Sequence, residues 1–502
     1  MKFKFTSESF KQKKHDLNRK HDFEDDDEYV WDQMKTLRAD ADQEPCKKCG
    51  WCNPSCIPIA IVFILIGLIV LLPLLEPSTD NLLHVKLNGT NYVCTDKCKI
   101  QLVESIPEGL NFSENSPKFL STYDAWSILL NSTKDSLDIG SFYWTLRGAD
   151  FYNHSSAWQG EDIFKQIMTN GRKKKYHIRI AQSTPTPNEP NLDTEIFIKK
   201  KVAEVRSVNF PRLVGGGVLH TKLWISDGQN FYLGSANMDW RSLTQVKELG
   251  VLVTNCTCLA KDVSKIFEAY WYLGVDDSHI PSRWPESYST KFNIKSPVSV
   301  NFNDGLNFNT FFSNSPPPLS STGRTNDLDA IVNVILSADK FVHIAVMDYY
   351  PLLIYSPKIR YWPYIDDALR KAAIENKVSV KMLISLWGSS RPSEDYFLKS
   401  LASLTSSFKG VDIEIRRFIV PATPDQAKIP FGRVNHNKYM VTDNTAYIGT
   451  SNWSGDYFTD TAGIGLIIKD SNTGSNENDT TIVTQLTSVF ERDWNSPYAV
   501  EL

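Results

Sequence analysis

Two short segments of the chain carry the same polar residues at the same spacing. Each contains a His-x-Lys sequence, an aspartate five residues after the lysine, and then a turn of small residues that ends in asparagine. These residues are His220, Lys222, Asp227 and Asn237 in the first segment and His436, Lys438, Asp443 and Asn452 in the second. One such pattern can arise by chance, but two copies with the same continuation indicate an internal repeat. We therefore predict one active site that takes half of its residues from each copy.

The chemistry that these residues permit is phosphodiester transfer. In an extended chain, residues i and i+2 point to the same side, so the histidine and the lysine of each segment project together. Lysine ammonium and asparagine amide groups donate to phosphate oxygens and stabilise the charge of the transition state. One imidazole can attack phosphorus while the other protonates the leaving oxygen and then activates water or an alcohol. The scheme uses no metal ion and no organic cofactor.

The elements around the two segments also repeat. Each copy is predicted to contain a helix, a strand, a second helix, two further strands, the motif, a last apolar strand and a helix with the sequence Phe-Glu-x-x-Trp. The elements before that helix span 122–132, 136–144, 163–170, 176–181, 203–208 and 249–253 in the first copy, and 327–338, 340–346, 365–376, 378–386, 412–419 and 464–468 in the second. Strands that alternate with helices predict an α/β layer architecture.

The predicted domain boundaries follow from this repeat and from one apolar run. They are a polar tail at 1–56, an apolar segment at 57–75, the first repeat at 76–280, a connector rich in Pro, Ser and Asn at 281–324, and the second repeat at 325–502. The tail has little to bury and is expected to be largely disordered. The formal net charge of −4 argues against a strongly basic nucleic-acid binder but permits a local groove.

The apolar run from Ile57 to Leu75 contains 19 residues and no charged side chain. As a helix it nearly matches a hydrocarbon core of about 30 Å. It begins too far from the N-terminus for a signal peptide and lacks a cleavage site, so we predict a signal anchor in a membrane. Lys47 and Lys48 precede the run and acidic residues follow it, which predicts a cytosolic tail and a luminal remainder.

The glycosylation sequons agree with this topology. Six N-x-S/T sequons, all C-terminal to the apolar run, predict N-glycosylation of Asn88, Asn111, Asn131, Asn153, Asn255 and Asn478. A seventh sequon begins at Asn452, which we expect to be buried in the active site and unmodified.

The eight cysteines divide at the apolar run. Cys94 and Cys98 form one close pair in the sequence, and Cys256 and Cys258 form another. Neighbours this close would form strained rings, so disulfides between the two pairs are favoured, with their exact pairing open. The other four precede the run and are Cys46, Cys49, Cys52 and Cys56. Their spacing permits an iron–sulfur or a zinc site, but their position beside a membrane favours acylation.

The repeated motif is similar to the HxKxxxxD signature of the phospholipase D superfamily. Segments 234–250, 432–442 and 448–458 resemble its type II membrane branch, which includes phospholipases D three and four, and the resemblance covers about residues 85–502. It implies two tandem phospholipase D-type α/β/α domains related by pseudo-twofold symmetry. It also implies a lysosomal 5′-to-3′ exonuclease on single-stranded DNA and RNA, with phospholipid transphosphatidylation to bis(monoacylglycero)phosphate as the alternative.

The resemblance also implies roles for the motif residues. His220 would be the nucleophile that forms a phosphohistidine and His436 the proton donor, although the symmetry allows the reverse. Glu248 takes the place of an acid that orients a catalytic histidine in the family, whereas no acid stands near Ala462 and Gly463. The two histidines are therefore expected to be electrostatically unequal.

The aspartates of the motif, Asp227 and Asp443, are expected to hold strand ends and the neighbouring lysines rather than to touch phosphate. The resemblance further implies a single-pass membrane protein of the endoplasmic reticulum, Golgi, endosomes and lysosomes. It permits a homodimer and a soluble form released by proteolysis.

Other functions and sites fit the sequence less well. A catalytically inactive relative is disfavoured because both histidines, both lysines and both asparagines are intact, and an adhesion ectodomain leaves the paired motifs unexplained. Trp144, Trp240 and Trp453 can either stack on nucleic-acid bases or pack in the core. The basic run 172–175 can either contact a phosphate backbone or cap a turn in solvent.

Overall fold

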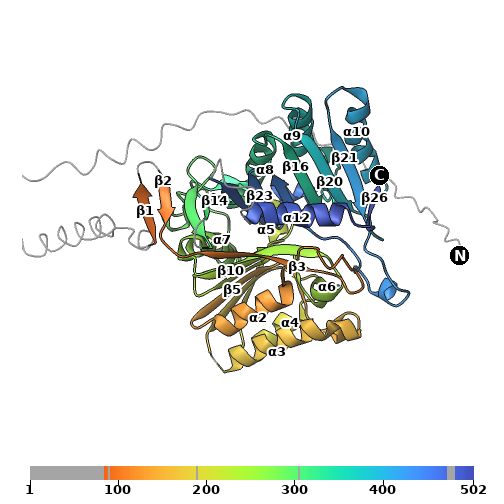
Figure 1. Ribbon diagram of the computed structural model, residues 1–502. Coiled ribbons are helices and arrows are strands. Elements are labelled where there is room, and N and C mark those ends of the chain that lie inside the picture. The colour runs from red at the N-terminus through yellow and green to blue at the C-terminus, as the bar shows by residue number, and fades with distance from the viewer. Residues whose placement is uncertain (1–83, 89–90, 174, 188–189, 304–305, 472–480) are drawn as a thin grey trace, which may run out of the picture. The chain divides into compact units, whose positions relative to one another are not determined.

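The computed structural model describes residues 84–88, 91–173, 175–187, 190–303, 306–471 and 481–502 (Figure 1). The predicted signal anchor at 57–75, the tail with its four cysteines, and Asn478 lie outside these residues. Among the helices that are described, none is long and apolar enough to cross a membrane.

The first sheet contains eight strands in the order β4-β3-β12-β10-β9-β5-β7-β8. Their bounds are β3 (Lys99–Ser105), β4 (Leu120–Ser121), β5 (Ser136–Ser141), β7 (His177–Ser183), β8 (Glu204–Val208), β9 (Leu223–Ser226), β10 (Asn230–Gly234) and β12 (Glu248–Thr254). Strands β5, β7 and β8 run parallel, because helices connect them, whereas β9, β10, β12 and β3 pair antiparallel.

Helices cover both faces of the first sheet. They are α2 (Thr122–Ser132), α3 (Trp158–Arg172) and α4 (Leu192–Lys199) on one face, and α7 (Thr257–Leu273) on the other (Figure 1). Successive strand residues point to opposite faces, so Trp224 packs in the α2 and α3 layer while Leu223 and Ile225 pack in the α7 layer. The α/β layer architecture predicted from the sequence is confirmed.

The second sheet contains twelve strands, eleven of them in the order β1-β2-β13-β14-β25-β23-β22-β16-β20-β21-β26, with β15 beside β14. The bounds are β1 (Val85–Asn88), β2 (Asn91–Cys94), β13 (Val298–Phe302), β14 (Leu306–Ser315), β15 (Thr325–Asn326), β16 (Phe341–Val346), β20 (Ser379–Ser385), β21 (Ile413–Phe418), β22 (Lys438–Thr442), β23 (Thr445–Gly449), β25 (Gly463–Asp470) and β26 (Ala499–Glu501). Its helices are α8 (Asp327–Leu336), α9 (Tyr364–Ile374), α10 (Ser393–Ser407) and α12 (Ile482–Trp494).

Seven strands of the first sheet recur in the second in the same order and with the same directions. The series β3-β12-β10-β9-β5-β7-β8 matches β14-β25-β23-β22-β16-β20-β21. In both series the last three strands are parallel and the others pair antiparallel. Each His-x-Lys segment ends at the start of the corresponding strand, β9 or β22.

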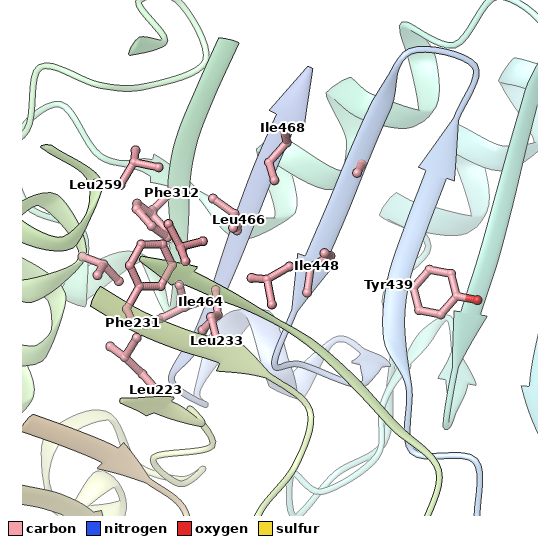
Figure 2. Close-up of a cluster of buried hydrophobic side chains, with 14 of the residues drawn as sticks. Leu223, Phe231, Leu233, Leu259, Phe312, Tyr439, Ile448, Ile464, Leu466 and Ile468 are labelled. Atoms are coloured by element: carbon pink, nitrogen blue, oxygen red, sulfur yellow. The ribbon is translucent and has the colours of Figure 1, made fainter. Parts of the chain in front are cut away.

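One hydrophobic cluster joins the two sheets. It brings Phe231 and Leu233 of β10 against Phe312 of β14 and Ile464 of β25, with Leu259 of α7 beside them (Figure 2). Fully burying side chains of this size contributes about 1.5–3 kcal/mol each. This shared core holds the two sheets, and therefore the two motifs, in a fixed relation.

The segment 281–324, expected to be a connector, contains two strands of the second sheet, β13 with five residues and β14 with ten. Its second strand, β14, is the counterpart of β3 and pairs with β25 along eight residues from Phe308 to Ser315. Several of its Asn, Ser and Thr side chains are buried together with the phenylalanines, so the polar composition concealed a buried strand. Helices α4 and α10 were also not predicted.

Two disulfides join the N-terminal strands to α7. They link Cys94 with Cys258 and Cys98 with Cys256, which confirms the pairing between clusters. Asn88, Asn111, Asn131, Asn153 and Asn255 are all exposed. Asn452 is only 1 % exposed, as expected for a sequon that is not modified.

Candidate active site

Two short backbone contacts bring the His-x-Lys segments together. The N–H of His220 donates to the carbonyl of Ala462 at 3.0 Å, and the N–H of His436 donates to the carbonyl of Lys247 at 2.8 Å. Each motif therefore pairs with the residue just before the β12 or β25 strand of the other sheet. The structure thus places both motifs at one site.

A glycine allows the first of these contacts. Gly217 has a φ of +74°, and a Cβ built there would lie 2.1 Å from the carbonyl oxygen of Asp460. The chain that leads to His220 can pass this closely only because residue 217 has no side chain. The sequence showed three consecutive glycines at 215–217 but not this reason for them.

The two lysines lie in the floor of the site and are almost completely buried. The ammonium group of Lys438 donates to the carbonyl of His436 at 2.8 Å, and that of Lys222 donates to the carbonyl of His220. Burial lowers the pKa of Lys438 to about 7, although Glu248 raises it. Burial, together with the charge of Lys438, lowers the pKa of Lys222 well below its ordinary value. Two desolvated ammonium groups facing one carboxylate form a site for an anion.

The two imidazoles have different partners on Nδ1. His220 Nδ1 lies 2.8 Å from the carbonyl oxygen of Thr450. A carbonyl can only accept, so Nδ1 of the neutral ring carries the proton and Nε2 keeps a free lone pair. His436 Nδ1 lies 2.8 Å from Oε2 of Glu248, an anion that stabilises the protonated ring.

Glu248 comes from the first repeat but binds the histidine of the second. It is fully buried, and the hydroxyl of Ser235 donates to its Oε2. The corresponding position in the second repeat is Gly463, where a Cβ would lie only 2.0 Å from Ser451 Oγ. A side chain at residue 463 would require Ser451 to move, and the second repeat has no acid at this position.

Burial controls the pKa of both histidines. For His220, desolvation and then the positive charges of Lys222 and Lys438 bring the pKa well below its ordinary value. For His436, desolvation lowers the pKa to about 4, and Glu248 opposes this shift without cancelling it. The expectation that the two histidines are electrostatically unequal rested on Glu248, whereas burial makes the larger contribution to both pKa values.

The two asparagines complete the site. Asn237 and Asn452 are 8 % and 1 % exposed, and Nδ2 of Asn452 donates to the hydroxyl of Tyr457 at 3.0 Å. Tyr457 lies in α11 (Asp456–Thr459), and its ring centre is 5.0 Å from that of His220. The sequence did not single out Tyr457, although it follows the second small-residue turn by only a few positions.

Asp348 is a further group near the site that the sequence did not indicate. It lies just after β16, and its carbonyl accepts from the N–H of Trp453 at 3.1 Å, beside Asn452. Desolvation raises the pKa of its carboxyl to about 6, although the charges of Lys438 and two arginines lower it.

The motif aspartates lie at the other end of the motif strands, away from the histidines. Asp227 accepts from the backbone N–H groups of residues 134, 135 and 136, and Asp443 accepts from those of residues 339 and 340. Both therefore brace strand ends, as expected from the sequence.

The other residues considered in the sequence have structural surroundings. Trp144, Trp240 and Trp453 are each at most 1 % exposed, so they pack in the core and cannot stack on a base. The described residues of the basic run, Arg172, Lys173 and Lys175, are exposed at the turn after α3. The described residues contain one cluster with the composition of a metal site, and it consists of the four disulfide-bonded cysteines.

Comparison with known proteins identifies close relatives. Residues 113–423 match the family described as "PLD3/4, PLD-like domain". The 5′-3′ exonuclease PLD3 of Xenopus tropicalis is 49 % identical over 446 residues, 88 % of this chain and 89 % of the relative. The PLD3 of Homo sapiens is 49 % identical over 82 % of each chain, and the 5′-3′ exonuclease PLD4 of Mus musculus is 42 % identical over 83 % and 82 %. The phosphatidylserine synthase of Haemophilus influenzae has a similar fold, with a TM-score of 0.50, 12 % identity and coverage of 76 % and 85 %.

Proposed function

The chain belongs to the PLD3/4 family of phospholipase D-like proteins, and from this premise we propose that it is a phosphodiesterase that removes nucleotides from the 5′ end of single-stranded nucleic acid. The relatives are named 5′-3′ exonucleases, which supports both the direction of degradation and nucleic acid as the substrate class. The single observation that carries the mechanism is the difference between the two Nδ1 partners, Thr450 for His220 and Glu248 for His436.

The first chemical step uses His220 as the nucleophile. Its Nε2 lone pair forms a bond to phosphorus while the bond from phosphorus to the leaving oxygen breaks. The protonated ring of His436 donates its Nε2 proton to that oxygen. Lys222, Lys438 and the two asparagine amides donate to the non-bridging oxygens, where charge develops. The products of this step are a phosphohistidine, neutral His436 and an alcohol.

The second step reverses these roles. Neutral His436 takes a proton from water, whose oxygen attacks phosphorus, and the bond from phosphorus to His220 breaks. The enzyme returns to its starting protonation state. The negative charge of a bound phosphodiester offsets both lysines, so it raises the pKa of His436 above the value of about 4 in the empty site and makes the acidic form accessible.

We further infer that the two sheets belong to tandem phospholipase D-type α/β/α domains related by pseudo-twofold symmetry, the second of which includes β14 from the segment that precedes residue 325. The matching order of seven strands supports this inference. The five exposed sequons and the two disulfides support a luminal location for the catalytic part, with 57–75 as its membrane anchor. A homodimer stays a prediction.

The phospholipid alternative uses the same two steps with a lipid alcohol in place of water. A parallel assay on a 5′-hydroxyl single-stranded oligonucleotide and on a glycerophospholipid separates the two substrates. We expect shortening of the oligonucleotide from its 5′ end at acidic pH in the presence of EDTA, and no shortening by His220→Ala. A wild-type protein that transfers the phosphatidyl group but leaves the oligonucleotide intact would overturn the nuclease proposal.

A further inference from the structure

An aromatic rim, formed by Phe151, Trp387 and Phe431, borders the site and has no part in the two chemical steps. Phe431 is 61 % exposed and Phe151 is 43 % exposed, while Trp387 is half-buried. The ring centre of Phe431 lies 6.5 Å from that of Phe151 and 6.4 Å from that of Trp387. Exposed aromatic rings that gather beside a functional site commonly mark a binding surface.

Backbone contacts tie two of these rings to the His436 motif. Phe431 precedes His436 in the same loop. The N–H of Asn435 donates to Ser385 Oγ at 3.1 Å, and Trp387 lies two residues after Ser385. Phe431 and Trp387 therefore stand on the two loops that flank the proposed proton donor.

A buried arginine fixes the third ring to the same surface. The guanidinium carbon of Arg241 lies 4.2 Å from the ring centre of Phe151, and its Nη1 donates to the carbonyl of Pro430, beside Phe431. Arg241 is 4 % exposed, and both oxygens of Asp239 accept from its Nε. Loops of both repeats therefore contribute to the rim, and Arg241 holds them beside each other.

A positive charge continues the rim toward His220. Arg391 is exposed, makes no salt bridge to any residue that the structure describes, and lies in the same loop as Trp387. Its guanidinium carbon is 5.6 Å from the ring centre of Tyr355, and Tyr355 packs against Tyr457 beside His220. The loop that carries Trp387 and Arg391 therefore extends from the His436 side of the site to the His220 side.

We propose that Phe151, Trp387 and Phe431 are a base-stacking platform for the nucleotides next to the scissile phosphodiester. Aromatic faces accept any base, and a neighbouring arginine suits the phosphate backbone between the stacked bases. Bases paired within a duplex cannot lie against these rings, so the platform selects single strands. This inference rests on the proposed nuclease function.

The test compares two substrates of the full-length chain. One is a single-stranded oligonucleotide, and the other is bis(p-nitrophenyl) phosphate, a phosphodiester without bases. Trp387→Leu and Phe431→Leu keep an apolar side chain but remove the π face. We expect each variant to raise KM for the oligonucleotide about tenfold, because stacking of one base is lost, and to leave kcat/KM for the small diester unchanged. Trp387→Phe should restore most of the oligonucleotide affinity.

Matched controls separate the platform from other effects. Tyr396, in α10, is 75 % exposed and outside the rim, so Tyr396→Leu should change neither substrate. An oligonucleotide with abasic sites at its second and third positions should bind wild type and Trp387→Leu equally weakly. Unchanged oligonucleotide kinetics in both leucine variants, or an equal loss on both substrates, would overturn the platform alone. A wild type that cleaves the small diester in a His220-dependent manner but no oligonucleotide would overturn the nuclease function and the platform with it.

Discussion

Nδ1 of His436, at the start of the second motif, lies 2.8 Å from Oε2 of Glu248, at the start of β12 in the first sheet. The carboxylate is fully buried. It raises the pKa of the imidazole, but burial of the imidazole lowers that pKa by more. The carboxylate of Glu248 in one repeat therefore influences the protonation of His436 in the other. Neither repeat alone contains both groups.

Replacement of Glu248 tests this relation. Glu248→Gln removes the charge that raises the pKa of His436, so that pKa falls further. Because His436 must be protonated to act as the proton donor, the alkaline limb of the kcat/KM profile moves to lower pH. We expect kcat on an oligonucleotide to fall by about a hundredfold or more, the usual range for impaired general acid catalysis. Ser235→Ala, which removes only one hydrogen bond to Glu248, should have a smaller effect. An unmoved alkaline limb would assign that limb to another group.

The two histidines should differ on a substrate with a good leaving group. p-Nitrophenolate departs without a proton, so His436→Ala should still form phosphohistidine from bis(p-nitrophenyl) phosphate, with a burst of one equivalent and slow turnover. His220→Ala should show neither burst nor turnover. Acid-labile phosphate on His436 in the His220 variant, detected by mass spectrometry, would reverse the assignment.

The sequence predicted the residues of the site better than their connections. His220, Lys222, His436 and Lys438 could be found because the motif is local and occurs twice. The contact of His436 with Glu248 depends on backbone pairing between distant segments, which no local pattern encodes. The strands of 298–315 were missed for another reason, because asparagines fill their polar positions and resemble loop composition. Burial of the site, which controls both histidine pKa values, depends on the packed interface and was likewise not predictable from the motif.

Phosphate binding should weaken above neutral pH. Burial lowers the pKa of Lys438 to about 7, so its ammonium form is complete at acidic pH and is lost as the pH rises through that value. Its hydrogen bonds to phosphate are strong only in the charged form. We expect KM for an oligonucleotide to increase between pH 6 and about 8, with the midpoint near the pKa of Lys438. In Lys438→Met, KM should be high at both pH values. If KM of that variant still rose with pH as much as KM of the wild type, the pH dependence would not come from Lys438.

The disulfides should stabilise the catalytic part without shaping its site. Cys94 and Cys258 are separated by 164 residues, so their bond constrains a long loop of the unfolded chain. Replacement of both by alanine should lower the free energy of unfolding by about 2–5 kcal/mol. The fall in Tm can be measured by differential scanning fluorimetry. Activity at 25 °C should be retained because neither cysteine contacts the histidines.

A buried ion pair beside Glu248 should hold the two repeats in register. The ammonium group of Lys247 lies 2.6 Å from Asp493 in α12, and both side chains are completely buried. The carbonyl of Lys247 also accepts from the N–H of His436, so a shift of this residue moves the acid and the base relative to each other. Asp493→Asn leaves the ammonium group of Lys247 without its carboxylate and should cost about 3–5 kcal/mol of stability. Lys247→Met should cost less, because Asp493 keeps its ion pair with Arg492 at 3.0 Å.

The double variant Lys247→Met/Asp493→Leu distinguishes the charge from the packing. Because it removes both charges and keeps apolar volume, we expect it to regain most of the free energy of unfolding lost in either single variant. A thermodynamic cycle from chemical denaturation gives the coupling energy between the two residues. If the losses were instead additive, the pair would contribute nothing as a pair, and the register of His436 and Glu248 would depend on the hydrophobic core between the sheets.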